Sequence, residues 1–151
     1  MSAKKNDYRV SAALDELSCD LMGAALDRLA EGEAVNVLLV VGDAQGNACD
    51  FEFSDDGEEA CLIGARDKVR ALARSKGDAS LGLGAPRYYA LCYEGAVDNG
   101  AGSYADALIM EFGEKGCPAF SAYSLFEGRG MGEDFAWSDP APAGEVESLL
   151  R

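Results

Sequence analysis

Three arginines in the middle of the chain have the side chain and the spacing to bind an anion. Arg66, Arg70 and Arg74 follow one another at steps of four residues, which places them on one face if the segment is helical. The arginine guanidinium binds carboxylates and phosphates through paired hydrogen bonds. We therefore expect this arginine ridge either to hold an anion or an acidic partner, or to balance acids on the protein's own surface.

A glycine-rich stretch, FEGRGMGEDFAW at residues 126–137, is the second candidate. Its G-x-G-x-G pattern is not followed by a helix start, so it departs from the phosphate-binding fingerprints. A wide turn with glycines at positive backbone angles is the favoured interpretation. Arg129 is then expected to pair with Glu127, Glu133 or Asp134. The alternative is a loop that contacts a partner, formed by Gly128, Arg129, Gly130 and Met131.

Several catalytic chemistries have no support in this sequence. Histidine is absent, which removes the Ser-His-Asp and Cys-His nucleophile arrangements. The acidic segment from Asp50 to Glu59 lacks the glycine and the final carboxylate at the positions that a calcium loop requires. The five cysteines never form a C-x-x-C pair, which argues against a zinc site or a disulfide framework. We predict no cofactor, no metal site and no assignable catalytic residue.

Composition sets the class of protein and its partners. With 27 acidic and 13 basic residues, the formal net charge is -14, which repels nucleic acid and anionic membranes. The length of 151 residues, 48% of them hydrophobic, fits a single domain over residues 1–151. Residues 1–8 are expected to be flexible, and residues 139–151 to be a tail that packs on the domain. Scattered free cysteines and short apolar runs predict a cytoplasmic protein.

The first half of the chain alternates between helix and strand patterns. Apolar residues at steps of three and four predict a helix from Ser11 to about Ala30, with Ser11 as N-cap and Gly32 as its stop. The valine-rich residues 34–41 and the alternating residues 48–53 predict a β-hairpin.

A second helix and a run of strands follow. The helix is predicted to start with a capping box of Asp56 and Glu59 and to end at Gly77. A final helical turn or two is expected at residues 145–151. Further strands are predicted at residues 87–97, 104–112, 119–127 and 134–138.

This order predicts an α+β fold with a mostly antiparallel sheet of five or six strands. Its two main helices are expected on one face of the sheet, in the order α-β-β-α-β-β-β-(β)-α. The element order resembles that of roadblock and profilin-type domains between Ser11 and Glu127. The longer strand meander and the segment after Glu127 depart from it.

The late strands carry apolar residues on both faces of the expected sheet. Tyr89, Leu91 and Tyr93 alternate with Tyr88 and other apolar residues. Helices on one face leave the second face in need of a cover. The segment from Phe135 to Leu150, which includes Trp137, is one candidate cover, and a second copy of the chain is the slightly favoured one. The expected apolar interface consists of Tyr88, Tyr93 and Trp137.

These features favour a small, acidic, non-catalytic binding or adaptor domain that acts through protein–protein contacts. The partner is another protein or, in the slightly favoured case, a second copy of the chain. The alternative is a sensor of a small anion or metabolite, or an enzyme without histidine chemistry. Its pocket is expected where the glycine-rich residues 80–86 and 126–137 meet the arginine ridge.

Overall fold

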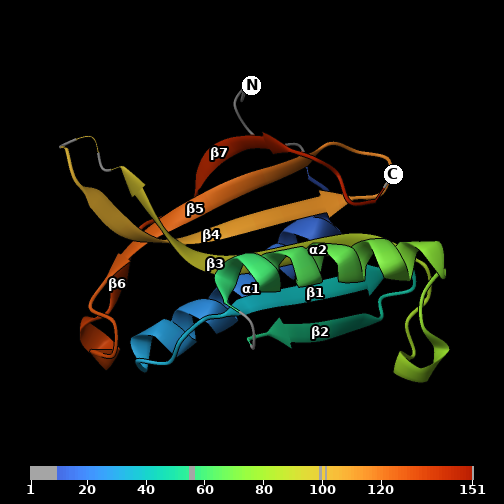
Figure 1. The fold of residues 1–151 in the computed structure, drawn as a ribbon, viewed down its shortest axis with the longest axis horizontal. Helices are drawn as coiled ribbons and strands as arrows, with labels where there is room; N and C mark the ends of the chain where they lie inside the picture. The colour runs from blue at the N-terminus through green and yellow to red at the C-terminus, as the bar shows by residue number, and fades with distance from the viewer. Residues whose placement is uncertain (1–9, 55–56, 99, 101, 151) are drawn as a thin grey trace.

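The computed structural model describes residues 10–54, 57–98, 100 and 102–150, so the expectation for residues 1–8 lies outside the described residues. It confirms the α+β class, with both helices and strands that follow the predicted order (Figure 1). In chain order the elements are α1 (Ala12–Ala30), β1 (Val37–Asp43), β2 (Ala48–Phe53), α2 (Glu58–Arg74), β3 (Pro86–Asp98), β4 (Tyr104–Glu114), β5 (Ala119–Glu127), β6 (Ala136–Trp137) and β7 (Ala141–Val146). Short 3-10 helices occupy Ala79–Leu81 and Gly132–Asp134.

The strands form one antiparallel sheet in the order β2-β1-β3-β4-β5-β6, and β7 also pairs with β5. The prediction of final helical turns at residues 145–151 was wrong, because Glu145 and Val146 end β7 and residues 147–150 are neither helix nor strand. The outer edge of β5 offers backbone groups that a strand can bond, and residues 141–146 pair with it. Pro142 lies opposite Ala122, where the register shifts, as expected for a residue without an N–H.

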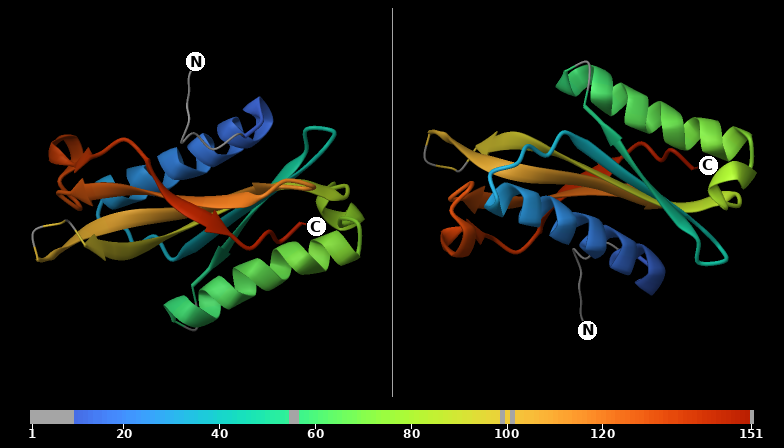
Figure 2. Two further views of the ribbon diagram at one scale, coloured as in Figure 1. Left: turned by 90° about the horizontal axis from the view of Figure 1, so that it is seen from above. Right: turned by 90° about the horizontal axis from the view of Figure 1, so that it is seen from below.

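The prediction that both main helices cover one face of the sheet was wrong, because α1 and α2 lie on opposite faces (Figure 2). The physical reason lies in β1, which is buried along its whole length. Leu38 and Val40 belong to the core under α1, whereas Leu39 and Val41 belong to the core under α2. Because successive side chains of a strand point to opposite faces, β1 needs a helix on each side.

Local signals set the ends of both helices. The Ser11 hydroxyl accepts a hydrogen bond from the Leu14 N–H at 3.1 Å, which confirms the predicted N-cap of α1. Gly32 follows the helix with φ of 84°, as expected for a helix stop. The predicted capping box of α2 lies partly outside the described residues, since Asp56 is not described. The N-cap residue of α2 is Gly57, so no side chain caps the first turn of this helix.

A buried carboxylate joins the β1–β2 turn to the loop before β3. Asp43 is 2% exposed and accepts hydrogen bonds from the N–H groups of Gln45 and Asn47, each at 2.9 Å. It also accepts bonds from the Asn47 side chain at 3.0 Å and from the Gly84 N–H at 2.8 Å. The Gly84 bond and then the Asn47 side chain are the main causes that lower the pKa of Asp43 to about 2, from 3.8.

We predict that Asp43→Asn lowers the free energy of unfolding near neutral pH and makes this free energy depend less on pH in acid. A carboxylate whose pKa is lowered by folding stabilises the protein above the unfolded pKa of 3.8, and this contribution is lost as pH falls through about 2. The asparagine variant should therefore lose less stability between these two pH values than the wild type does. Urea unfolding across this pH range measures the difference. The exposed Asp50→Asn variant is the control, and an equally flat profile for it would contradict the prediction.

Candidate functional site

One half of the sheet face that carries α2 has no helix over it. α2 packs on β1, β2 and β3, and in Figure 1 it lies in front of these strands while β4 and β5 have no helix on that side. The exposed part of this face is centred on a row of opposed residues, Tyr93 on β3, Ile109 on β4 and Tyr123 on β5. All three are half-buried. We call this surface the open face, and it also includes half-buried Leu125 and Val97.

A partly buried ion pair forms the inner edge of the open face. Arg66 of α2 binds Glu111 of β4 through two hydrogen bonds, Nη2 to Oε2 at 2.6 Å and Nε to Oε1 at 3.3 Å. The hydroxyl of Tyr93 donates to Glu111 Oε2 at 3.2 Å. Glu111 is buried, whereas a third of the Arg66 side chain is exposed. The pair therefore ties the flank of α2 to the uncovered half of the sheet.

Electrostatics in this cluster follow from burial and from Glu111. Burial and then the Glu111 charge raise the pKa of Tyr93 to about 12, so its hydroxyl keeps its proton and remains a donor. Burial acts to lower the pKa of Arg66, but the hydrogen bonds and charge of Glu111 outweigh it and raise that pKa. The cluster is thus an arginine cation and a carboxylate bridged to a neutral phenol. This arrangement holds elements in place and offers no unpaired base.

A groove of about 370 Å³ runs between α2 and the segment after β7. Ile63 on the α2 wall is 52% exposed. Arg70 on the same wall reaches Asp67 at 3.4 Å and Glu147, on the opposite wall, at 3.7 Å. The groove is lined by Ile63, Arg66, Arg70, Glu111, Val146 and Leu149, among others. It continues the open face toward the C-terminal end of the chain.

The three arginines of the ridge differ in their contacts within the chain. Arg66 and Arg70 both pair with acids of the same chain, while Arg74 is exposed at the end of α2. The expected balancing of the protein's own acids therefore describes two of these arginines. Asp67 lies three residues before Arg70 on α2, whereas Glu111 and Glu147 come from β4 and from the segment after β7, which the sequence spacing did not indicate.

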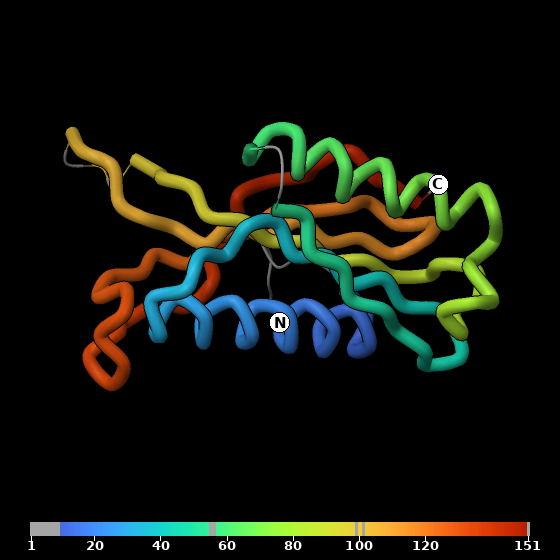
Figure 3. The backbone as a smooth tube through the Cα atoms, turned by 60° about the horizontal axis from the view of Figure 1, so that its bottom comes forward, coloured from blue at the N-terminus to red at the C-terminus, as the bar shows by residue number. Residues whose placement is uncertain are grey.

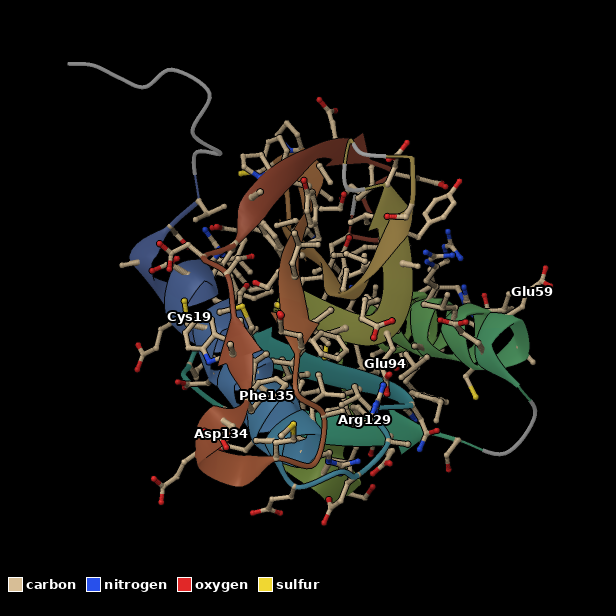
Figure 4. All side chains as sticks on the ribbon, turned by 90° about the vertical axis from the view of Figure 1, so that its left-hand side faces the viewer. Cys19, Glu59, Glu94, Arg129, Asp134 and Phe135 are labelled. Carbon is tan, nitrogen blue, oxygen red and sulfur yellow. The ribbon has the colours of Figure 1, made fainter. Side chains whose placement is uncertain are left out.

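The expected contact loop is attached to the rest of the fold. The guanidinium of Arg129 pairs with Glu94 of β3, and Figure 4 shows the two side chains pointing toward each other. The Gly130 N–H donates to the Leu29 carbonyl at 2.9 Å, which places the loop beside the C-terminal end of α1 (Figure 3). The predicted pairing of Arg129 with Glu127, Glu133 or Asp134 was therefore wrong, because β3 brings Glu94 closer. Met131 remains exposed.

The glycines of this loop have the backbone angles that the sequence predicted. Gly128, Gly130 and Gly132 all have positive φ, at 87°, 78° and 55°. At Gly128 a Cβ atom would approach the Asp134 carbonyl oxygen to 2.8 Å. The stretch is therefore a wide turn from β5 to β6, as the favoured interpretation proposed.

The three residues of the expected apolar interface do not come together. Tyr88 packs against the core under α1, whereas Tyr93 packs against the core under α2. Trp137 is half-exposed on the short strand β6, opposite Phe126. α2 covers part of the second face, and Leu149 and Leu150 of the tail are buried in the same core.

The pocket proposed for a small-ligand sensor is also not assembled. Residues 80–86 lie beside the β1–β2 turn through the Gly84–Asp43 bond, while residues 126–137 lie at the other end of the molecule beside α1 (Figure 3). An apolar cavity of about 210 Å³ lies between α1, β4, β5 and residues 140–142. It is smaller than most ligand pockets, which are about 300–1,000 Å³.

Sequence reasoning did not single out Ile63, Glu111 or Tyr123. The sequence signal for the open face was that, in residues 104–112 and 119–127, apolar residues occupy both alternating sets of positions, which point to the two faces of a sheet. Only the strand register shows that Ile109 and Tyr123 are direct neighbours. Only the position of α2 shows that they are left uncovered.

Among the described residues, no helix is both long and apolar enough to cross a membrane. Within the same part of the chain, no group of three cysteine, aspartate or glutamate side chains is placed to hold a metal ion. No protein-family model, curated protein or solved structure matches the sequence or the fold of this chain. The open face is therefore interpreted from its own geometry.

Proposed function

We propose that this protein is a non-catalytic binding domain that acts through protein–protein contacts made by its open face. The observation that carries the proposal is the row of Tyr93, Ile109 and Tyr123 on a stretch of sheet that α2 leaves uncovered. Aromatic and aliphatic side chains on an uncovered sheet face are the chemistry that partner surfaces bury. The neighbouring Arg66–Glu111 pair supports the proposal, because it fixes the inner edge of that surface.

The site of action that we propose is the cytoplasm. All five cysteines are free thiols, and Cys61 and Cys92 are buried. Burial raises the pKa of Cys92 to about 12, so this thiol stays protonated and unreactive. Such cysteines suit a reducing compartment.

The proposal predicts that peptides selected for binding to this protein contact Ile109 and Ile63, so that binding is lost when either residue is replaced. A phage-displayed library of random peptides is panned against the wild-type protein, and the enriched peptides are tested on three variants. Ile109→Asp and Ile63→Asp should weaken binding by roughly tenfold or more, because a buried contact residue is replaced by a charge. Leu81→Asp adds the same charge at an exposed site off the open face and should change binding less than about twofold.

Two results would overturn the proposed function. One is the absence of any enriched peptide, and the other is equal binding to all three variants. Sedimentation of the wild type at micromolar concentration tells a second copy from another protein. A dimer that Ile63→Asp dissociates would make this chain its own partner through the same face.

A further inference from the structure

The backbone of the open face excludes one common type of ligand. β4 pairs with β3 on one side and with β5 on the other, so its N–H and C=O groups are already bonded within the sheet. An extended peptide binds by adding a strand to a free sheet edge, and no free edge exists at Ile109. A ligand of this face must therefore make its contacts through side chains.

The width of the uncovered surface matches one helix. Strands lie about 4.8 Å apart and a helix with its side chains is about 10 Å wide, so one helix covers about two strands. α2 covers β1 and β3 and reaches β2, and Leu149 and Leu150 of the tail pack in the same core as Ala119 of β5. On this face, the stretch of β4 and β5 around Ile109 and Tyr123 stays uncovered. A helix placed beside α2 would cover these two strands, with its apolar side over Ile109 and Tyr123.

Charges at the borders of this surface favour a basic ligand. Asp67 on α2 and Glu147 on the opposite wall of the groove are 66% and 73% exposed at the side chain. Glu59 adds a further exposed acid at the start of α2. The nearby cations do not balance these acids, since Arg66 binds Glu111 and the single charge of Arg70 is shared between Asp67 and Glu147.

The net charge of the chain argues in the same direction. At -14 the protein attracts cations over its whole surface. A second copy would bring the same acids to both borders and would be repelled.

From these observations we infer that the open face binds an amphipathic helix of a partner protein, with basic residues beside its apolar stripe. The inference rests on the proposed function and specifies its partner. The helix lies beside α2 and along the strands, so its apolar stripe, at steps of three and four residues, crosses the row of Tyr93, Ile109 and Tyr123. Its lysines or arginines face Asp67 and Glu147, which lie together at the groove end of the open face on either side of Arg70.

The experiment uses the full chain and three synthetic peptides of about 18 residues, which make roughly 27 Å of helix. The first places leucines at helical spacing among lysines, the second replaces each lysine with glutamate, and the third alternates leucine and lysine with the period of a strand. The chain contains two isoleucines: Ile109 lies at the centre of the open face, and Ile63 lines the groove that continues it. Selective labelling of isoleucine methyl groups therefore gives NMR signals that report on this site alone.

We expect the leucine–lysine helix to shift both isoleucine signals and the other two peptides to bind roughly tenfold more weakly or worse. The single tryptophan, Trp137, lies beyond the open face opposite Phe126 of the α1-side core, and its fluorescence should stay unchanged. Ile109→Asp should abolish binding even though it makes the protein more acidic. The added negative charge would increase the general attraction of a cationic peptide. Loss of binding in this variant would therefore show that a specific apolar contact is required. The Leu81→Asp variant carries the same net charge and should bind like the wild type.

Each other outcome overturns the inference in a different way. Equal binding of the glutamate peptide would refute the basic character of the partner, and equal binding of the strand peptide would refute the helix. A wild-type dimer that Ile63→Asp dissociates would identify a second copy as the occupant. Failure of all three peptides, while library-selected peptides still require Ile109, would leave the proposed function standing and refute this partner. Ile63→Asp lies at an exposed helix position and replaces Ile109→Asp if that variant does not fold.

Discussion

Gly77→Ala is expected to lower the free energy of unfolding by about 3 kcal/mol, the sum of a left-handed backbone penalty and overpacking. Gly77 has φ of 105°, and a Cβ atom there would lie 2.4 Å from the Leu83 carbonyl oxygen and 2.5 Å from the Gly84 carbonyl carbon. These are backbone atoms that cannot simply rotate away. The Asp78 N–H binds the Leu83 carbonyl at 2.8 Å, and Gly84 is held by Asp43.

Urea unfolding of the variant measures this loss, and Gly46→Ala is the matched control. Gly46 also has a positive φ, 92°, but a Cβ atom there would meet nothing within 4 Å. It should therefore show only the backbone penalty of about 1–2 kcal/mol. Equal losses at the two positions would show that the close approach of residues 83 and 84 is not the cause.

Arg66→Met is expected to lower the free energy of unfolding by about 2–3 kcal/mol, because it leaves the buried Glu111 carboxylate without its cation. This value lies at or below the lower end of the cost of breaking a buried pair, since a third of the Arg66 side chain is exposed and water can reach the site. The Tyr93 hydroxyl would still donate to Glu111. Methionine keeps much of the apolar stem of arginine, so the loss reports mainly on the charge.

The double variant Arg66→Met with Glu111→Leu tests whether the two residues act together. Removing both charges should recover most of the stability lost by Arg66→Met, because no unpaired charge stays buried. Glu111→Leu alone should cost less than Arg66→Met alone, since the arginine can turn toward water. Thermal and urea unfolding of the three variants give the coupling free energy. If the double variant loses as much unfolding free energy as the two single variants together, the two residues act independently and the prediction is contradicted.

This pair also shows why the site was only partly predictable. Steps of four residues placed Arg66 and Arg70 together on one side of a helix, and the helix formed as its periodicity predicted. Two of their acidic partners are distant in sequence: Glu111 lies 45 positions after Arg66, and Glu147 lies in the segment after β7. Local periodicity carries no information on such a separation, because it depends on which strand the helix crosses. The same holds for Arg129, whose partner Glu94 lies 35 residues away.

The sequence by itself determined the elements of this protein and their chemistry. Apolar periods of 3.6 and 2, the Ser11 cap and the glycines at positive φ are local properties, and they predicted both helices, most of the strands and the turn from β5 to β6. In the late strands, apolar residues point to both faces of the sheet, which showed that both faces must be covered.

Only the tertiary structure decided which contacts those faces make. β1 lies inside the sheet and is buried on both faces, so α1 and α2 must lie on opposite sides of it. α2 connects the edge strand β2 to β3 and therefore covers that end of the sheet, which leaves Ile109 and Tyr123 open. The residues of the candidate site thus come from sequence alternation, but their exposure comes from the path of the chain over the sheet.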